Sequence, residues 1–324
     1  MKPKGGRHTS WSLVDISSPL PIIKSALSEG RLYNYSGFEV LQFIHRIEVE
    51  LKVAFYGARG STPVAESDYA RFGGNTSCIL MTFRNGRIGI LDAGTGIRKL
   101  GADFAARSIE QYDNIFIGLS HTHWDHIQGF PFFNPAYDSR RHFTVSIYRE
   151  GRNTSDLEDI FATQMQRDYF PVSMDKMGAT LVFWQTDLSI FTAPSGVTVT
   201  ASKHNHPGDA YSYRIVEGKT TLVYCTDVEH VGGIDPKVVA LCRNADLLIH
   251  DAQYTPEELK DKKGWGHSSW EQAVEVAAQA GVKKLALFHH DPEHNDAFLM
   301  NIERECQRLF SEAFLAREGL EIEI

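Results

Sequence analysis

The sequence predicts an α/β fold in which helices cover β-sheets. From Leu51 onward, short apolar runs alternate with stretches of helical spacing, and several of the apolar runs end in histidine or aspartate. A strand-rich half with βαβ units on either side of it is typical of sheets with helices packed outside them. The 324 residues, 42% of them hydrophobic, suit one large or two ordinary domains with a sizeable core.

The first half of the predicted domain contains more strands than helices. Strands are expected at "LKVAFYG", "SCILMTF" and "RIGILDAG", the last two joined by a hairpin turn at Asn85-Gly86. Thr95 is the expected N-cap of a helix in "TGIRKLGADFAAR". "NIFIGLS" and "RHFTVSIYR" are then predicted strands, and "SDLEDIFATQMQRDYF" is a predicted helix stopped by Pro171.

The second half continues with four predicted strands, "ATLVFWQ", "GVTVTASKH", "YSYRIVE" and "TTLVYCTD". After them come a strand, a helix and a strand, at "ADLLIHD", "SSWEQAVEVAAQA" and "KKLALFHH". A long amphipathic helix is expected from Asp296 to Arg317. Residues 1–50 hold two short amphipathic stretches without a chemical motif, so we expect an N-terminal extension (1–50) and one domain (51–324).

Composition excludes several classes of protein. No run approaches the roughly 18 consecutive apolar residues of a membrane span, and the N-terminus lacks a secretory signal, so we expect a cytoplasmic protein without membrane contact. The net charge of −8 argues against a broad basic surface for a nucleic-acid polymer. The four cysteines lie far apart without a CxxC pair, which indicates free thiols: Cys78, Cys225, Cys242 and Cys306.

Five predicted strands end in metal-ligand side chains, and in α/β proteins ligands bind where strands end. These side chains are His121, His123, Asp125, His126, His204, His206, Asp227, His250, Asp251, His289 and His290. Imidazole and carboxylate without thiolate is the ligand set of catalytic zinc, which we favour, or of manganese or iron. Asp227 is the candidate to bridge two divalent ions, which at a separation of about 3.5–4 Å would generate hydroxide at neutral pH.

The motif "HTHWDH" after a buried strand, with a later histidine, aspartate and histidine on strand ends, resembles the metallo-β-lactamase superfamily from Leu51 to the C-terminus. The resemblance implies an αββα sandwich, with Asp92 of "ILDAGTG" beneath the metal site. It also implies the ligands: His121, His123 and His206 for one ion, and Asp125, His126 and His289 for the other, with Asp227 between them. His204 and His290 are the alternatives to His206 and His289.

The segments "LLIHDAQY" and "GWGHSSWEQAVEVA" resemble ribonuclease Z and its small-substrate relatives. This resemblance implies that His267 helps to protonate the leaving oxygen and that Asp251, where ribonuclease Z typically has glutamate, orients it. We count Asp125 with these two as catalytic. Ser268 or Ser269 with Glu271 also fits a helix capping box. The loops "GARGSTP" and "RFGGNTSC" match this branch, and their candidate substrate-binding residues are Arg59, Thr62 and Asn75.

Ribonuclease Z of the bacterial type holds tRNA with a long arm between the third histidine motif and the bridging aspartate. Here only about twenty residues separate His206 from Asp227. We therefore expect hydrolysis of a small or cyclic phosphodiester, such as a cyclic nucleotide, by a homodimer whose contact includes residues 1–50 or the loop at Tyr169. The alternatives are a tRNA 3′-end endonuclease, a thioesterase of the glyoxalase II type, a flavodiiron enzyme and a non-catalytic binding module.

Overall fold

The computed structural model describes residues 51–104, 114–150 and 156–324, and the expectations for residues 1–50 lie outside them. Within these ranges the chain forms two mixed seven-stranded sheets. The order in the first sheet is β14-β1-β2-β3-β4-β5-β6, and in the second it is β13-β12-β11-β10-β9-β8-β7. In each sheet a parallel part continues into an antiparallel part.

The first sheet is built from seven strands: β1 (Leu51–Gly57), β2 (Cys78–Phe83), β3 (Ile88–Leu91), β4 (Asn114–Leu119), β5 (His142–Tyr148), β6 (Thr180–Thr186) and β14 (Glu321–Glu323). The second is built from β7 (Ile190–Thr192), β8 (Thr198–His204), β9 (Ala210–Glu217), β10 (Thr220–Cys225), β11 (Leu247–Asp251), β12 (Lys284–Phe288) and β13 (Ala313–Leu315).

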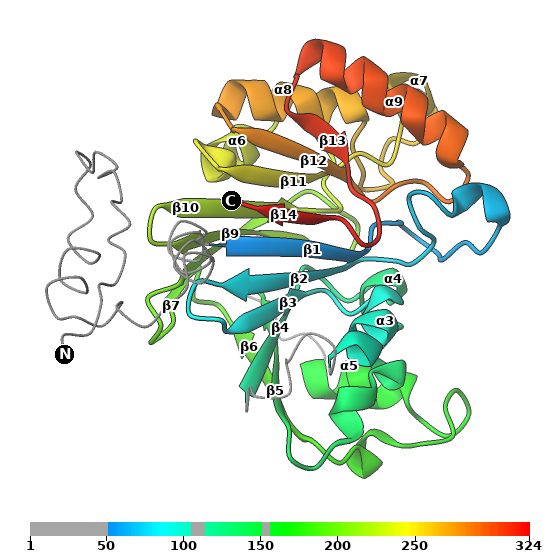
Figure 1. The fold of residues 1–324 in the computed structure, drawn as a ribbon, viewed down its shortest axis with the longest axis vertical. Helices are drawn as coiled ribbons and strands as arrows, with labels where there is room; N and C mark the ends of the chain where they lie inside the picture. Colours follow the sequence, from blue (N-terminus) through cyan, green and yellow to red (C-terminus); the bar gives the residue numbers. More distant parts are fainter. Residues whose placement is uncertain (1–50, 105–113, 151–155) are drawn as a thin grey trace, which may run out of the picture. The chain divides into compact units, whose positions relative to one another are not determined.

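Figure 1 shows α8 and α9 lying over β11, β12 and β13, and α3 and α5 beside the strands of the first sheet. The described α-helices are α3 (Gly96–Asp103), α4 (Trp124–Ile127), α5 (Leu157–Gln164), α6 (Pro236–Cys242), α7 (Pro256–Asp261), α8 (Trp270–Ala280) and α9 (Asp296–Leu309). Short 3-10 turns are η1 (Ser67–Tyr69), η3 (Phe130–Phe132), η4 (Asn134–Tyr137) and η5 (Met174–Lys176). No helix in the described ranges combines the length and apolar composition needed to cross a bilayer.

Alternation along the strands produces the layers. In β10, Leu222 and Tyr224 belong to the core between the sheets, whereas Val223 and Cys225 belong to the core beneath the outer helices. Successive side chains of a strand point to opposite faces, so one apolar run serves both layers. A third cluster packs the first sheet against its own helices. The result is the expected αββα sandwich.

The end of the chain differs from expectation. The predicted helix from Asp296 to Arg317 ends at Leu309, and the next segment forms β13, which pairs in parallel with β12. The predicted helix of residues 155–170 is also shorter, since α5 ends at Gln164 and Tyr169 lies in a turn. The edge strands β7, β13 and β14 have only three residues each, too few to give a periodic pattern.

Two predicted helix caps are corrected. Thr95 precedes α3, but its hydroxyl accepts a hydrogen bond from Thr76 N rather than from the helix, at 2.9 Å. Ser269 is the N-cap of α8, and Gln272, not Glu271, closes the capping box. In both places the sequence signal marks the start of the helix correctly, while tertiary contacts decide which side chain bonds to which amide.

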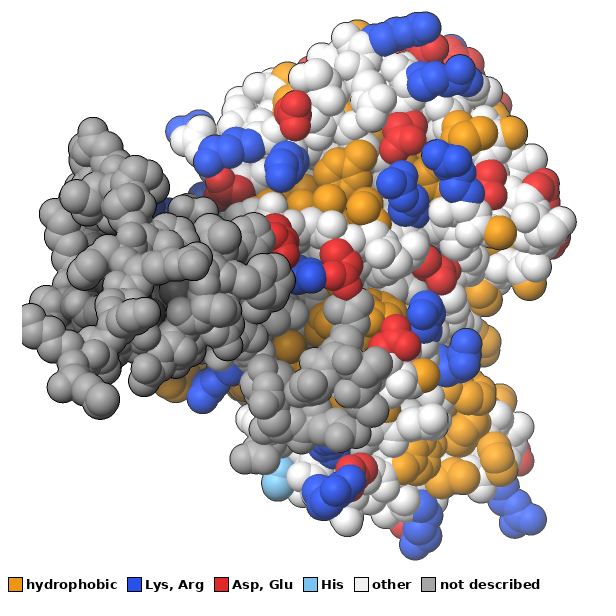
Figure 2. All heavy atoms as spheres, viewed as in Figure 1, with side chains coloured by type: hydrophobic (Ala, Val, Ile, Leu, Met, Phe, Trp, Pro, Cys, Tyr) orange, Lys and Arg blue, Asp and Glu red, His pale blue; other side chains and the backbone are white. Residues whose placement is uncertain are grey.

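Charges are mixed on the face that Figure 2 shows. Lysine and arginine side chains alternate there with aspartate and glutamate, without one broad basic area. A surface that tracks the phosphates of a long polyanion usually presents a continuous basic field. This face does not have one.

Candidate metal centre

The structure brings the ligand-type residues of both sheets together. The "HTHWDH" segment leaves β4 of the first sheet and turns into the one-turn helix α4, whose first turn holds Asp125. The later residues leave strands of the second sheet: His206 follows β8, Asp227 follows β10 and His289 follows β12. Because these strands end at the same edge, side chains far apart in the sequence come together: His126 and His289, 163 positions apart, place their Nε2 atoms 3.3 Å from each other.

Three histidines form the first group, and their ligand atoms lie within 4.8 Å of one another: His121, His123 and His206. His206 Nε2 is 3.1 Å from His123 Nδ1. Asp227 Oδ1 approaches the same point, 3.8 Å from His121 Nε2 and 3.9 Å from His206 Nε2. His123 is exposed and the other three are buried, so the group opens to solvent on one side.

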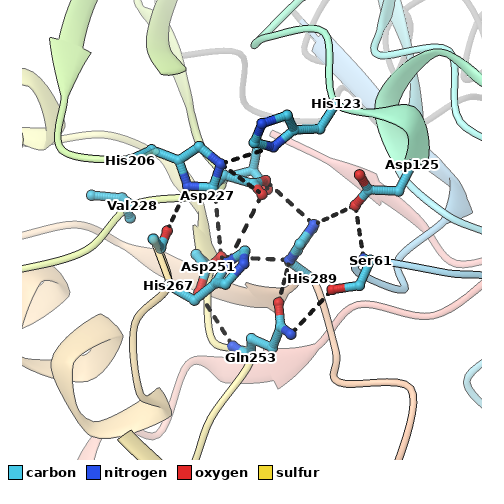
Figure 3. A network of polar contacts seen from close by, with 12 residues as sticks. Ser61, His123, Asp125, His206, Asp227, Val228, Asp251, Gln253, His267 and His289 are labelled. Carbon is cyan, nitrogen blue, oxygen red and sulfur yellow. Dashed lines mark hydrogen bonds and ion pairs between the residues drawn. The ribbon is translucent and has the colours of Figure 1, made fainter. Parts of the chain in front are cut away.

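The second group is packed more tightly and is buried throughout: Asp125, His126, Asp227 and His289. Asp227 Oδ2 is 3.2 Å from His126 Nε2 and 3.3 Å from His289 Nε2. Asp125 Oδ2 is 3.2 Å and 3.1 Å from the same two nitrogens. The two oxygens of Asp227 therefore face different groups, the position that a bridging carboxylate needs (Figure 3).

The hydrogen bonds of these histidines assign their protons. His126 Nδ1 is 2.8 Å from Asp92 Oδ2 and His289 Nδ1 is 3.0 Å from Gln253 Oε1, and both partners can only accept. Each Nδ1 therefore carries a hydrogen, and the Nε2 atom of each ring faces inward. These two nitrogens lie 3.3 Å apart, with oxygens of Asp125 and Asp227 beside them. Such an arrangement calls for a cation.

The first group fits a cation by the same reasoning. His206 Nδ1 donates to Gly266 O at 2.9 Å, which leaves its Nε2 as a lone pair. His121 Nδ1 faces Ser120 Oγ at 3.1 Å, and the Ser120 hydroxyl itself donates to Asp92. His121 Nε2 is buried without a hydrogen-bond partner among the described residues. An orphaned buried lone pair is costly unless a metal ion or a water occupies the point that it faces.

The pKa values of His126 and His121 are shifted in opposite directions by their surroundings. Burial opposes the charged form of His126, but Asp125, Asp227 and Asp92 outweigh it and hold the pKa of His126 well above its usual range. Burial dominates at His121 and lowers the pKa of this ring well below its usual range. His121 is thus neutral at neutral pH, as a metal ligand must be.

Asp92 supports the cluster from beneath, as the superfamily resemblance implies. Its carboxylate accepts from Ser120 N at 2.7 Å, from Ser120 Oγ at 2.9 Å and from Tyr224 OH at 2.6 Å, besides its bond to His126. These bonds connect the ends of β3, β4 and β10. Asp92 also holds a left-handed backbone, with φ of 58°, as do Asp227 at 55° and His289 at 64°. Such residues outside glycine concentrate where function requires a fixed geometry.

Gln253 is a site residue that sequence reasoning missed. Its side chain accepts from His289 Nδ1, while its amide nitrogen lies 3.3 Å from Ser61 Oγ and 3.3 Å from Asp291 Oδ2. Ser61 in turn donates its backbone N–H to Asp125 Oδ2 at 2.8 Å. Gln253 lies two residues after Asp251 in the loop that follows β11, and this position is the signal that could have indicated it.

Beside the second group lies a pair formed by His267 and Asp251. His267 Nδ1 is 2.9 Å from Asp251 Oδ2 and 3.8 Å from Asp227 Oδ1. Asp251 is fully buried and also accepts from Ser268 N at 2.8 Å and Asp227 N at 3.1 Å. Burial opposes charge on His267, but Asp251 outweighs it and raises the pKa of His267 to about 9. A protonated imidazole beside the cluster can donate a proton to a bound group.

The competing histidines make structural bonds instead. His204 Nε2 lies 3.0 Å from the carbonyl of Asp227, and its Nδ1 lies 2.8 Å from Ser212 Oγ. His290 Nε2 donates to Ala316 O at 2.8 Å. Both rings have buried surroundings that lower their pKa values, to about 4 for His204 and about 3 for His290. Neither belongs to a ligand group, so the geometry favours His206 and His289.

The three candidate substrate-binding residues are not grouped together. Arg59 is fully buried, and its guanidinium donates to backbone carbonyls of Gly73, Asp291 and His294. Asn75 donates its side-chain amide to Glu318 at 3.0 Å. These two hold loops in place, because Arg59 Nε and Nη1 and the Asn75 amide nitrogen are already bonded within the protein. Arg59 Nη2 is buried without a hydrogen-bond partner among the described residues. Thr62 is exposed next to Ser61 and remains a candidate.

Comparisons with known proteins agree with this geometry. A family model described as a beta-lactamase superfamily domain matches residues 89–290. Ribonuclease Z of Prochlorococcus marinus (strain MIT 9303) is 25% identical over 327 residues, covering 85% of this chain and 98% of the relative. The metallo-beta-lactamase fold protein YhfI from Bacillus subtilis has a TM-score of 0.64 at 24% identity, covering 85% of this chain and all of that chain. A diphosphatase from the PhnP family has a TM-score of 0.60 at 17% identity, covering 85% and 98%.

Proposed function

The chain belongs to the metallo-β-lactamase superfamily and is a metal-dependent hydrolase, and from this premise we propose that it hydrolyses a small or cyclic phosphodiester, cyclic nucleotides included. The observation that carries the proposal is the position of the His267–Asp251 pair. It lies beside Asp227, which faces both ligand groups, and Asp251 accepts from His267 Nδ1 at 2.9 Å, which orients the ring and favours its protonated form. Hydrolysis of a phosphodiester requires a proton for the departing alkoxide, and such a pair can supply it.

Two divalent ions fit the donor set, zinc first by its nitrogen and oxygen ligands, with manganese and iron accepting the same set. The proposed ligands are His121, His123 and His206 for one ion, Asp125, His126 and His289 for the other, and Asp227 for both. Bound there, the ions would activate water and neutralise the charge of the phosphoryl oxygens. None of the four cysteines takes part, since all are buried and free elsewhere.

The chain's own residues would perform the remaining tasks. Asp251 accepts from His267 Nδ1, so the proton that can leave is on His267 Nε2. Asp125 is held by the backbone N–H of Ser61 at 2.8 Å, which fixes the carboxylate at the edge of the second group. His267 would then protonate the departing sugar oxygen, and for a 3′,5′-cyclic nucleotide the product is a linear monophosphate.

The size of the substrate is inferred from the connection between β9 and β10. These strands are joined at Gly218-Lys219, with Glu217 paired to Thr220, so the span between His206 and Asp227 is a tight hairpin. There is no room in it for the long tRNA-holding arm of ribonuclease Z. The hairpin therefore supports a small substrate.

Cleavage of precursor tRNA is the second candidate. The similarity to Ribonuclease Z of Prochlorococcus marinus extends over 85% of this chain, which favours it and stands against our expectation that no nucleic-acid polymer is bound. We also propose that the protein is a homodimer. Light scattering tests this proposal, because it measures the mass of the protein in solution.

One assay distinguishes these functions. The purified protein, loaded with zinc or manganese, is given 3′,5′- and 2′,3′-cyclic nucleotides, bis-p-nitrophenyl phosphate, precursor tRNA and S-lactoylglutathione. We expect hydrolysis of the phosphodiesters and none of the thioester. Efficient cleavage of precursor tRNA with cyclic nucleotides untouched would show that the second candidate is correct.

A further inference from the structure

Three large apolar side chains that are exposed lie within four positions of a candidate site residue in the sequence. Trp124 is 77% exposed, Val231 73% and Trp265 57%. Trp124 lies between His123 and Asp125, two of the ligand candidates. Single exposed apolar residues are ordinary on protein surfaces, but several around one polar cluster indicate a binding surface.

The loop that carries Trp265 is held in place by a buried carboxylate. Glu229 accepts from Gly264 N at 2.6 Å and from Gly266 N at 3.1 Å, on both sides of the tryptophan. Lys262 places its Nζ 4.1 Å from the centre of the Trp265 ring and so covers one face of the indole. The backbone on both sides of Trp265 is therefore held in place, which reduces the entropic cost of binding a ligand against its ring.

Each of the two tryptophans is next in sequence to a residue that contacts His206. Gly266, next to Trp265, accepts from His206 Nδ1 at 2.9 Å. His123, next to Trp124, lies 3.1 Å from the other nitrogen of the same ring. A phosphodiester at the first ligand group would thus have one of its substituents beside each of these loops.

We propose that Trp265, with Trp124 on the other side of His206, binds the base of the substrate, which makes that substrate a nucleotide phosphodiester. This inference rests on the proposed function and narrows it. A purine or pyrimidine stacks on an indole whatever its hydrogen-bonding groups are. The Lys262 ammonium on the opposite face strengthens the site for an anionic nucleotide, because it adds a positive charge next to the ring.

The test separates base binding from catalysis by using ligands with and without a base. Calorimetry on the metal-loaded protein gives the Kd of adenosine monophosphate and of ribose 5-phosphate. We expect the wild type to prefer the nucleotide, and Trp265→Ala to lose roughly ten- to a hundredfold of that preference, the effect of removing one base–aromatic stack. Trp265→Phe should retain most of it. Tyr169→Ala, which removes an exposed aromatic ring from the turn that follows α5, is the matched control and should retain all of it.

Kinetics provide the second measurement. Trp265→Ala should raise KM for a 3′,5′-cyclic nucleotide and leave the hydrolysis of a base-free cyclic ribose phosphate unchanged. Equal weakening of both ligands by Trp265→Ala, or an unchanged preference, overturns the base-binding role. Should no phosphodiester be hydrolysed while the nucleotide preference still depends on Trp265, the proposed reaction fails and the base-binding site remains.

Discussion

The orientation of three histidines of the site, His126, His289 and His267, is set by the group that accepts a hydrogen bond from Nδ1. His126 and His289 donate from Nδ1 to oxygens that can only accept, so their Nε2 atoms point to the cluster. His267 has the same donor–acceptor bond, to Asp251, but it is absent from both of the groups that include the "HTHWDH" residues. Its ring stacks on that of His289, with centroids 5.0 Å apart. In the proposed assignment one residue type thus serves two roles, ligand and proton donor, although His267 also lies within ligand distance of Asp227, Asp251 and His289.

The role of His267 can be tested by removing its ring. We expect His267→Ala to keep its metal content, because the seven proposed ligands remain. Turnover should fall by roughly two to four orders of magnitude, the usual contribution of a general acid. The fall should be smaller for substrates that release p-nitrophenolate, since this leaving group needs little protonation. Elemental analysis and rates on good and poor leaving groups measure both effects; equal losses on the two would indicate a binding role instead.

At the scale of elements, the strands of the core were predictable and the edges were not. The apolar runs at β10 and β12 are buried on both faces, and β4 alternates between buried and exposed residues, so each of these segments has the pattern of a strand. The segment of β13 has helical spacing, and only its pairing with β12 makes it a strand. Caps were ambiguous for a similar reason: Thr95 bonds to Thr76, a residue from the neighbouring β-strand segment that the local sequence does not reveal.

The loop before α8 offers a test at this scale, because a side chain added at one of its glycines would contact His206 and one added at another glycine would not. Both have positive φ, 94° at Gly266 and 83° at Gly264. A Cβ at Gly266 would lie 2.1 Å from His206 Nδ1, whereas one at Gly264 would meet nothing within 4 Å. We expect Gly266→Ala to displace His206 and weaken metal affinity by roughly ten- to a hundredfold, as losing an outer-shell contact does.

Gly264→Ala is the control for this substitution, since it introduces the same backbone strain without the contact. Titration of each metal-free variant with zinc gives the two affinities. Equal affinities for Gly266→Ala and Gly264→Ala would mean that the position of His206 does not depend on this loop.

At the scale of the whole molecule, the order of ligand residues along the chain could be predicted, but the choice between neighbours could not. His204 and His206 both follow an apolar strand, and only the structure shows that His204 bonds to Ser212 and to the backbone of Asp227. The only signal for Gln253 was its place two residues after Asp251, because a neutral amide has no characteristic spacing. Its side chain contacts Ser61, which is 192 residues away in the sequence, and only the fold brings the two together.

The two sheets meet at the candidate metal centre, so metal binding should stabilise the entire fold. The ligand residues of "HTHWDH" come from the first sheet, and His206, Asp227 and His289 from the second. Removing the ions leaves buried carboxylates beside one another and inward-facing lone pairs without a cation. We expect two ions per chain by elemental analysis and a lower Tm after chelation. A ligand at a hundred times its Kd contributes about 2.7 kcal/mol to the free energy of unfolding.

Asp227→Asn separates this effect from unspecific action of the chelator. The substitution keeps the shape of the side chain but removes the charge that faces both groups, with Oδ2 3.2 Å from His126 Nε2. The variant should bind less metal, lose activity and show a Tm that the chelator no longer changes, measured by differential scanning calorimetry with and without added zinc. A wild-type Tm that is insensitive to chelation, or a metal content of one ion per chain, would contradict a centre of two ions that joins the sheets.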